Sequence, residues 1–295
     1  MPAHGDLEQF ASFDEEAQML LQGGETAKTR PAETSRWFAQ IAEEINRDVR
    51  EAEQRIGPER NKEFDSTIAD LKILSNLALY HSRRIPAAVS YRVFERTHDP
   101  QALDDAIRYE RSAVEAWGLL VNSAGDFYTD DLEMGVRSAG LCGHWKDELI
   151  LLEKGLGKLE EQRRGLTPAV GTAAAPRYTV AFGPGDHEPP AVIHQSITNA
   201  PVGKPLAIAA EVRDTSGVKW VHLRYRSVNQ RQDYQTLPMV RGGESDRYEA
   251  VIPAEQIDSR FDLMYFIEAM DAQGNGKIYP DLNQQTPYVV VRLMR

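Results

Sequence analysis

The sequence predicts a multidomain α and β protein, with an N-terminal all-α helical bundle followed by an antiparallel β-sandwich. Up to about residue 165, apolar residues recur at the three- and four-residue spacing of amphipathic helices. After about residue 190 they recur at every second position, which is typical of strands. Residues 166–186 are rich in Gly, Pro and Ala and poor in charge, as linkers are. We therefore expect a helical bundle domain over 1–165, a linker over 166–186 and a sandwich over 187–295.

The first half contains apolar-periodic stretches of helical length. We expect helices over 7–22, 33–56, 59–83, 100–124 and 144–164, with a looser segment over 125–143. Thr34 or Ser35 is expected to cap the second helix, and Asp99 the fourth. Pro86 should kink or restart the third helix, which then continues over 87–97.

The second half contains strand-length runs separated by turn signals. These runs are 191–197, 205–214, 219–227, 234–240, 247–253, 263–271 and 287–293. Val221, Leu223 and Tyr225 alternate with more polar neighbours, as expected of a sheet with one buried face. Short strands at this regular spacing predict a sandwich. A further strand is expected over 177–183, packed against one of the two domains.

Composition and charge exclude several classes of partner. The formal net charge is −11, and residues 1–165 hold 31 acidic and 21 basic side chains. Such a surface disfavours nucleic acid, whose binding depends on Lys and Arg contacts to phosphate. The longest apolar stretch is far shorter than the roughly 18 residues of a membrane span. The single cysteine excludes an internal disulfide and a Cys-rich zinc site. The sequence has no HxxxH or CxxC pattern that would supply metal ligands, and we expect no metal and no cofactor.

Two stretches of the second half carry a family resemblance. "EVRDTSGVKWVHLRYR" and "LMYFIEAMDAQGNGKIYP" resemble the immunoglobulin-like or fibronectin type III-like modules of large secreted bacterial proteins. Strands ending in Y-x-x-x-A-x-D-x-x-G-N are common in those modules, and the matching residues here are Tyr265, Ala269, Asp271, Gly274 and Asn275. The resemblance implies an immunoglobulin-like sandwich without the usual disulfide.

The turn after this strand also has a physical interpretation. The Asp271 side chain should accept hydrogen bonds from the backbone amides that follow it. Gly274 and Gly276 should supply positive φ angles in a hairpin turn. Both expectations follow from the residue types alone.

The helical half carries a second resemblance. "DLKILSNLALYHSRRIPAAVSYRVFERTHDPQAL", "AVEAWGLLV" and "GHWKDEL" resemble helical regions downstream of catalytic barrels in large bacterial glycan-degrading proteins. This implies a non-catalytic accessory region that supports an upstream catalytic domain or contacts polysaccharide. The N-terminus lacks the basic and apolar regions of a signal peptide. We therefore expect this chain to be secreted or periplasmic as part of a longer protein.

Two other function classes remain open. One is a glycoside hydrolase or lyase with its active site in the helical half, and the other is a structural or protein-interaction module. No nucleophile elbow, phosphate-binding loop or dinucleotide-binding glycine pattern is present in the sequence. The sequence therefore leaves the catalytic residues of such an enzyme unknown.

The stretch "SAGLCGHWKDE" contains the only cysteine, Cys142, two residues before His144. Side chains two apart point in different directions on a helix or strand, so this pair does not form a nucleophile–base dyad. We expect a loop that leads into a helix, with Asp147 in its first turn, where the helix dipole favours acids. Trp145 and His144 remain as candidate ligand-binding residues.

Three further residues are candidates for ligand binding. His81 is expected to be a hydrogen-bonded histidine near a helix end, and Arg84 is placed to bind an acidic sugar or another domain. Trp220 fits a core or an interface, but it could also form a sugar-stacking platform with nearby aromatic rings. That platform would consist of Trp220, His222, Tyr225 and Tyr234.

The looser segment carries a group of acidic residues. Asp126, Asp130, Asp131 and Glu133 have the oxygen ligands that calcium prefers. Their spacing does not match an EF-hand loop. A solvated acidic loop is therefore the favoured interpretation.

Overall fold

The computed structural model confirms a helical bundle followed by an antiparallel-rich β-sandwich. It describes residues 6–133, 135–166, 174–181, 187–243, 245–284 and 286–294. The chain divides into two compact units, which we call the helical unit and the sandwich unit. None of the described helices combines the length and apolarity needed to cross a membrane.

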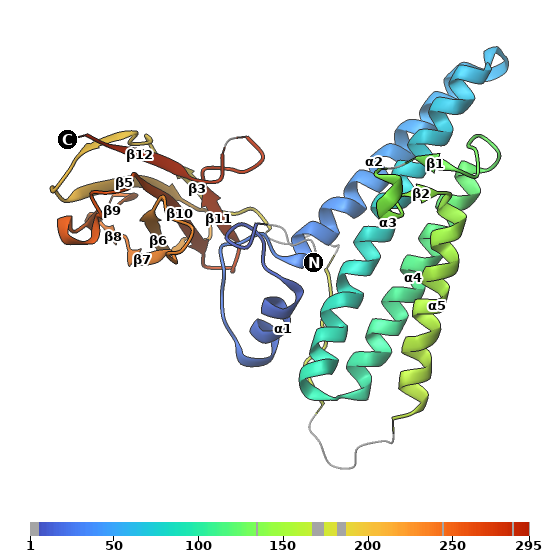
Figure 1. Ribbon diagram of the computed structural model, residues 1–295, viewed down its shortest axis with the longest axis horizontal. Helices are drawn as coiled ribbons and strands as arrows, with labels where there is room; N and C mark the ends of the chain where they lie inside the picture. The colour runs from blue at the N-terminus through green and yellow to red at the C-terminus, as the bar shows by residue number, and fades with distance from the viewer. Residues whose placement is uncertain are drawn as a thin grey trace. The chain divides into compact units, whose positions relative to one another are not determined.

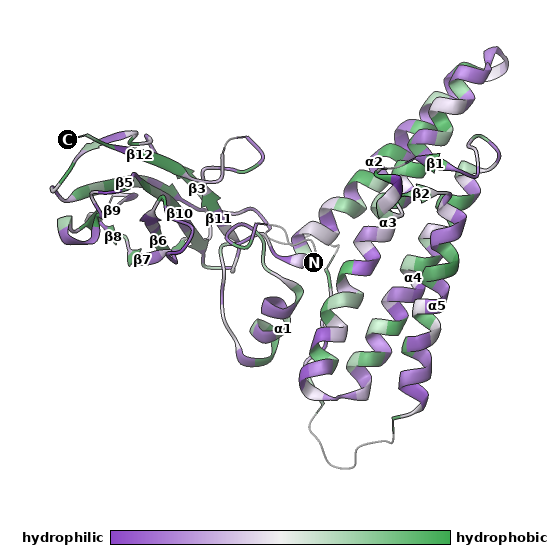
Figure 2. Cartoon of the chain, viewed as in Figure 1, coloured by the Kyte–Doolittle hydropathy of each residue, from purple (hydrophilic) through white to green (hydrophobic). Residues whose placement is uncertain are grey.

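The helical unit is built from five α-helices (Figure 1). They are α1 (Phe13–Gln22), α2 (Pro31–Ile56), α3 (Lys62–Thr97), α4 (Pro100–Ala124) and α5 (Trp145–Arg164), with short 3-10 helices η1 (Gly57–Glu59) and η2 (Arg137–Ala139) and a hairpin of β1 (Leu132–Glu133) and β2 (Cys142–Gly143). The helices show polar and apolar residues around their circumference, as expected of helices with one buried face (Figure 2). In the core, α3 packs against α2 and α4, and α5 packs against α4.

Helix starts follow capping chemistry. Asp99 caps α4 as predicted, because its side chain accepts a hydrogen bond from the Gln101 amide at 3.0 Å. The first helix begins at Phe13 and not at residue 7, because Ser12 caps it and bonds the Glu15 amide at 3.1 Å. The predicted cap of α2 is wrong, since that helix begins at Pro31.

Pro86 lies inside α3 and is buried, so the predicted restart of the helix is wrong. A proline cannot donate to the carbonyl four residues earlier, which here belongs to Ser82. The Ser35 hydroxyl of α2 donates to that carbonyl at 2.7 Å. The fully buried Ser35 thus satisfies the acceptor that Pro86 leaves open.

Residues 174–181 return to the helical unit. Tyr178 is buried among residues of α1, α3 and α4. The Arg177 guanidinium bonds the Asp105 carboxylate at 2.7 Å, and the Ala175 amide bonds Asp99 at 2.6 Å. The described residues 177–181 are not a strand, so that prediction is wrong for them; residues 182 and 183 lie outside the described part.

The sandwich unit contains two sheets (Figure 1). The strands are β3 (Ala191–Ile193), β4 (Asn199–Pro201), β5 (Leu206–Arg213), β6 (Val218–Ser227), β7 (Gln235–Pro238), β8 (Val240–Arg241), β9 (Arg247–Ile252), β10 (Leu263–Asp271), β11 (Gly276–Tyr279) and β12 (Val289–Met294). One sheet has the order β4-β12-β10-β6-β7, with β11 also paired to β10, and the other has the order β3-β5-β9-β8. Among the named pairs of this unit, β12–β4 is parallel and the others are antiparallel.

The core lies between the two sheets and follows the predicted alternation. Leu223 pairs with Ile267, and Tyr225 pairs with Tyr265, and all four side chains are almost fully buried. The turn after β10 also follows the prediction in part, because Asp271 accepts from two later backbone amides and Gly274 has a φ of 91°.

Two short N-terminal segments, 6–11 and 24–29, belong to the sandwich unit and not to the helical unit. We call them together the clasp. They include Ala27, which is buried against Phe266 of β10 and Ile278 of β11. Strand β10 is therefore buried on both faces. The predicted positive φ of Gly276 is wrong: a Cβ at this position would lie 2.4 Å from the Ala27 Cα, so the glycine provides space for the clasp.

Candidate functional site

The predicted ligand-binding residues do not form one site. His81 and Arg84 lie on one stretch of α3, while His144 and Trp145 lie at the start of α5. Trp220 lies on β6 of the sandwich unit. The surroundings of each residue decide what chemistry it offers.

His81 belongs to a group of aromatic rings on α2 and α3, which we call the aromatic patch. The patch consists of Trp37, Phe38, Tyr80 and His81. The Phe38 and His81 rings stack at a centroid distance of 5.2 Å, and the other adjacent rings meet edge to face at 5.0 and 5.1 Å. Such contacts hold the rings in fixed orientations.

Trp37 is the exposed member of the patch. Its side chain is 56% exposed, whereas the other three tryptophans are half-buried. It lies next to Phe38, which belongs to the apolar stripe of α2, and therefore lies off that stripe. Trp37 was not among the predicted ligand-binding residues, although a large aromatic residue beside the apolar stripe was a signal present in the sequence.

His81 and Arg84 determine the electrostatics of the patch. Burial lowers the pKa of His81, so its ring is neutral at neutral pH and stacks as an uncharged aromatic. The Arg84 guanidinium lies over the Tyr80 ring, 5.3 Å from its centroid. Arg84 is 45% exposed and leaves the edge of the patch positively charged.

Glu110 of α4 faces Arg84. Glu110 is 9% exposed, and its carboxylate lies 3.9 Å from the Arg84 Nε. Burial raises the pKa of Glu110, and the positive charge of Arg84 opposes this only in part. The sequence could not have indicated Glu110, because one carboxylate among 45 acidic residues carries no local signal.

His144 and Trp145 serve the start of α5, as the sequence predicts. The His144 Nδ1 accepts from the Lys146 amide at 3.1 Å, and Asp147 accepts from the His144 amide at 2.9 Å. The Trp145 carbonyl accepts a hydrogen bond from the Trp117 indole at 2.8 Å. Both residues thus have structural contacts, and neither is exposed.

Two acidic residues of the loop form ion pairs with neighbouring cations. Asp131 pairs with Arg137 at 2.9 Å, and Asp130 pairs with Lys146. In the part of the chain that the structure describes, no three His, Cys, Asp or Glu side chains are grouped to hold a metal. These ion pairs agree with the interpretation as a solvated acidic loop.

The predicted platform around Trp220 assembles only in part, since Trp220 and Tyr234 pack against the same hydrophobic cluster but Tyr225 does not. Trp220 stacks on His222 at 4.4 Å and donates its indole hydrogen to Glu25 of the clasp at 3.1 Å. Tyr225 is buried between the two sheets and is 1% exposed, whereas Tyr234 packs against Phe266 outside that core. The prediction is wrong for Tyr225 because it and Trp220 differ by an odd number of positions on one strand.

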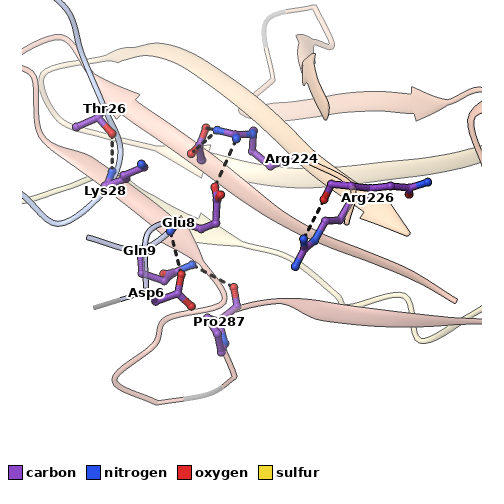
Figure 3. A network of polar contacts seen from close by, with 10 residues as sticks. Asp6, Glu8, Gln9, Thr26, Lys28, Arg224, Arg226 and Pro287 are labelled. Atoms are coloured by element: carbon purple, nitrogen blue, oxygen red, sulfur yellow. Dashed lines mark hydrogen bonds and ion pairs between the residues drawn. The ribbon is translucent and has the colours of Figure 1, made fainter. Parts of the chain in front are cut away.

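Residues of the clasp also make polar contacts with the sheet that contains β6 and β10 (Figure 3). Arg224 of β6 pairs with Glu268 of β10 at 3.2 Å and with Glu8 of the clasp at 3.5 Å. Burial raises the pKa of Glu268, and Arg224 opposes this rise. Two carboxylates thus share one guanidinium group.

The comparisons with known proteins identify no family. No protein-family model matches this sequence, and no curated protein matches it significantly. A solved structure of murine CRIg aligns at 9% sequence identity and a TM-score of 0.24, covering 36% of this chain and 98% of that chain. At these values the alignment supports no statement about fold or function.

Proposed function

We propose that this chain is a non-catalytic accessory module of a secreted or periplasmic carbohydrate-active protein. We further propose that its helical unit contacts polysaccharide through the aromatic patch. The observation that carries this proposal is the exposed Trp37 ring, which is held beside Phe38 and the neutral His81 ring. The resemblance of the helical half to regions of glycan-degrading proteins supports the choice of ligand.

A fixed aromatic surface suits a sugar because pyranose rings present apolar C–H faces that pack on aromatic faces. Exposed aromatic side chains with few rotatable bonds provide contact area at low entropic cost. Arg84 adds a hydrogen-bond donor at the edge of the patch for hydroxyl or carboxylate groups. The patch therefore fits a neutral or weakly acidic polysaccharide.

The test is retention of the full chain on a panel of insoluble polysaccharides. We expect Trp37→Ala to weaken retention by about tenfold, the size of effect typical of a truncated aromatic anchor. Leu74→Ala is the matched control, because Leu74 is an exposed apolar residue of α3 outside the patch. Equal retention of both variants would contradict the role of Trp37.

The same panel separates the other function classes. A wild-type chain that no polysaccharide retains, but that captures a protein partner, would favour an interaction module. Turnover of a glycan would favour an enzyme, for which the buried Glu110 beside Arg84 is the candidate acid. Loss of that turnover in Glu110→Gln would then establish the enzyme alternative.

The proposal also expects a catalytic domain encoded upstream of Met1. The genomic sequence before this position tests the expectation directly. A gene that begins there without such a domain would contradict the accessory role.

A further inference from the structure

The two clasp segments hold each other. Phe10 and Thr29 form a parallel bridge, in which the Thr29 amide donates to the Gln9 carbonyl at 2.9 Å and the Ala11 amide donates to the Thr29 carbonyl at 3.0 Å. An Asx turn at Asp6 adds a local bond to the Glu8 amide at 2.9 Å (Figure 3). The clasp is therefore a small structural element of its own.

The clasp buries little apolar surface of its own. Its buried apolar residues are the small Ala11 and Ala27, at 8% and 4% exposed, whereas the large Leu7 and Phe10 are 58% and 39% exposed.

The other anchors of the clasp on the sandwich are polar. The Gln9 side-chain amide donates to the Pro287 carbonyl at 3.3 Å. Glu8 pairs with Arg224, and Glu25 pairs with Lys219 and accepts a hydrogen bond from the Trp220 indole. Partly exposed ion pairs of this kind contribute only about 0–1 kcal/mol each.

The surface beneath the clasp is very different. Phe266 is 1% exposed and Glu268 is 6% exposed, on the face of β10 that points away from the sandwich core. Arg224 and Trp220 of β6 lie on the same face, because they alternate with the core residues of that strand. Weak contacts therefore cover a surface that combines aromatic rings with a cation.

We propose that the clasp is a displaceable element, which opens as a unit while both sheets of the sandwich stay folded. The Glu8–Arg224 and Glu25–Lys219 ion pairs hold it in the closed position. Segments with few buried apolar contacts open at lower free energy than the core elements around them. Opening uncovers the face of Trp220, Arg224 and Phe266.

Gly276→Ala is a direct test in the full chain. The added Cβ would meet the backbone of Ala27 at 2.4 Å, and the φ of Gly276 lies outside the positive range that disfavours alanine. The steric clash should therefore push the clasp away from the sheet. Gly157→Ala on α5 is the matched control, because a Cβ there meets nothing within 4 Å.

The measurement is amide hydrogen exchange followed by mass spectrometry. In Gly276→Ala we expect exchange over 6–11 and 24–29 to rise about tenfold or more, with β5 and β9 unchanged. Glu8→Gln removes the ion pair with Arg224 without a steric clash and should raise exchange over the same segments by a smaller factor. The control variant should match the wild type.

Two results would overturn the proposal. An equal rise over the clasp, β5 and β9 would show that the clasp is part of the core and does not open separately. Unchanged exchange over the clasp in both Gly276→Ala and Glu8→Gln would show that these contacts do not control the opening of the clasp.

Discussion

The Ser35 hydroxyl donates a hydrogen bond to the Ser82 carbonyl at 2.7 Å, and both residues are buried. This carbonyl is the one that Pro86 leaves without a helical donor. A single side chain of α2 therefore allows a proline in the middle of the 36-residue helix α3. The relationship leads to the first prediction.

Ser35→Ala should lower the free energy of unfolding by about 1–3 kcal/mol, because it leaves a buried carbonyl without a partner. Urea denaturation followed by far-UV circular dichroism measures the change. Ser75→Ala is the control: Ser75 is also buried and donates to the Ala42 carbonyl at 3.0 Å, but that carbonyl lies within a regular stretch of α2. A cost for Ser75→Ala equal to that for Ser35→Ala would contradict the special role of Pro86.

Asp105→Asn should loosen residues 174–181 and lower the free energy of unfolding by about 1–3 kcal/mol, the range for bonds to charged groups. Burial raises the pKa of Asp105, but hydrogen bonds from Arg177 and Arg108 outweigh it and lower the pKa overall. The unfolded carboxyl titrates near 3.8, so the stabilisation is complete above that pH and is lost as pH falls through the folded pKa.

Stability curves of the wild type and Asp105→Asn at several pH values check this prediction. The difference between them should be constant at neutral pH and should shrink in acid. Asp104→Asn serves as a comparison, because Asp104 is more exposed and pairs with Arg163 of α5 instead. A difference that grows in acid would contradict the assigned sign.

Glu110→Gln should remove a pH dependence of the opposite sign. Burial raises the pKa of Glu110 above its ordinary value of 4.5, so the folded state binds a proton more tightly than the unfolded state. The stability contributed by this proton is present below pH 4.5 and is lost as pH rises through the folded pKa. The wild type should therefore lose stability over this window relative to Glu110→Gln.

Urea titrations of both proteins between pH 4 and pH 8, at intervals of about half a unit, resolve such a window because one pKa unit corresponds to roughly 1.4 kcal/mol. Glu115→Gln is the control on the same helix, since Glu115 is exposed. Identical pH profiles for the wild type and Glu110→Gln would contradict the prediction.

Local sequence signals predicted much of the fold. The Asp99 cap, the turn at Asp271 and the start of α5 at His144 depend on hydrogen bonds between residues close in sequence. The candidate site was harder to predict. His81 and Arg84 were named from an expected position near a helix end, which is wrong because both lie well inside α3. Trp37 and Glu110 join them only through packing of α2, α3 and α4.

The sequence by itself determined the order of a helical part and a sandwich, because apolar periods of 3.6 and 2 are properties of neighbouring residues. Only the tertiary structure decided how the N-terminal residues are used. Ala27 fits against Phe266 and Ile278 because Gly276 has no side chain, and no local pattern connects residues about 250 positions apart. The tertiary structure likewise decided that Pro86 continues its helix, since its carbonyl acceptor finds a donor, Ser35, on another helix.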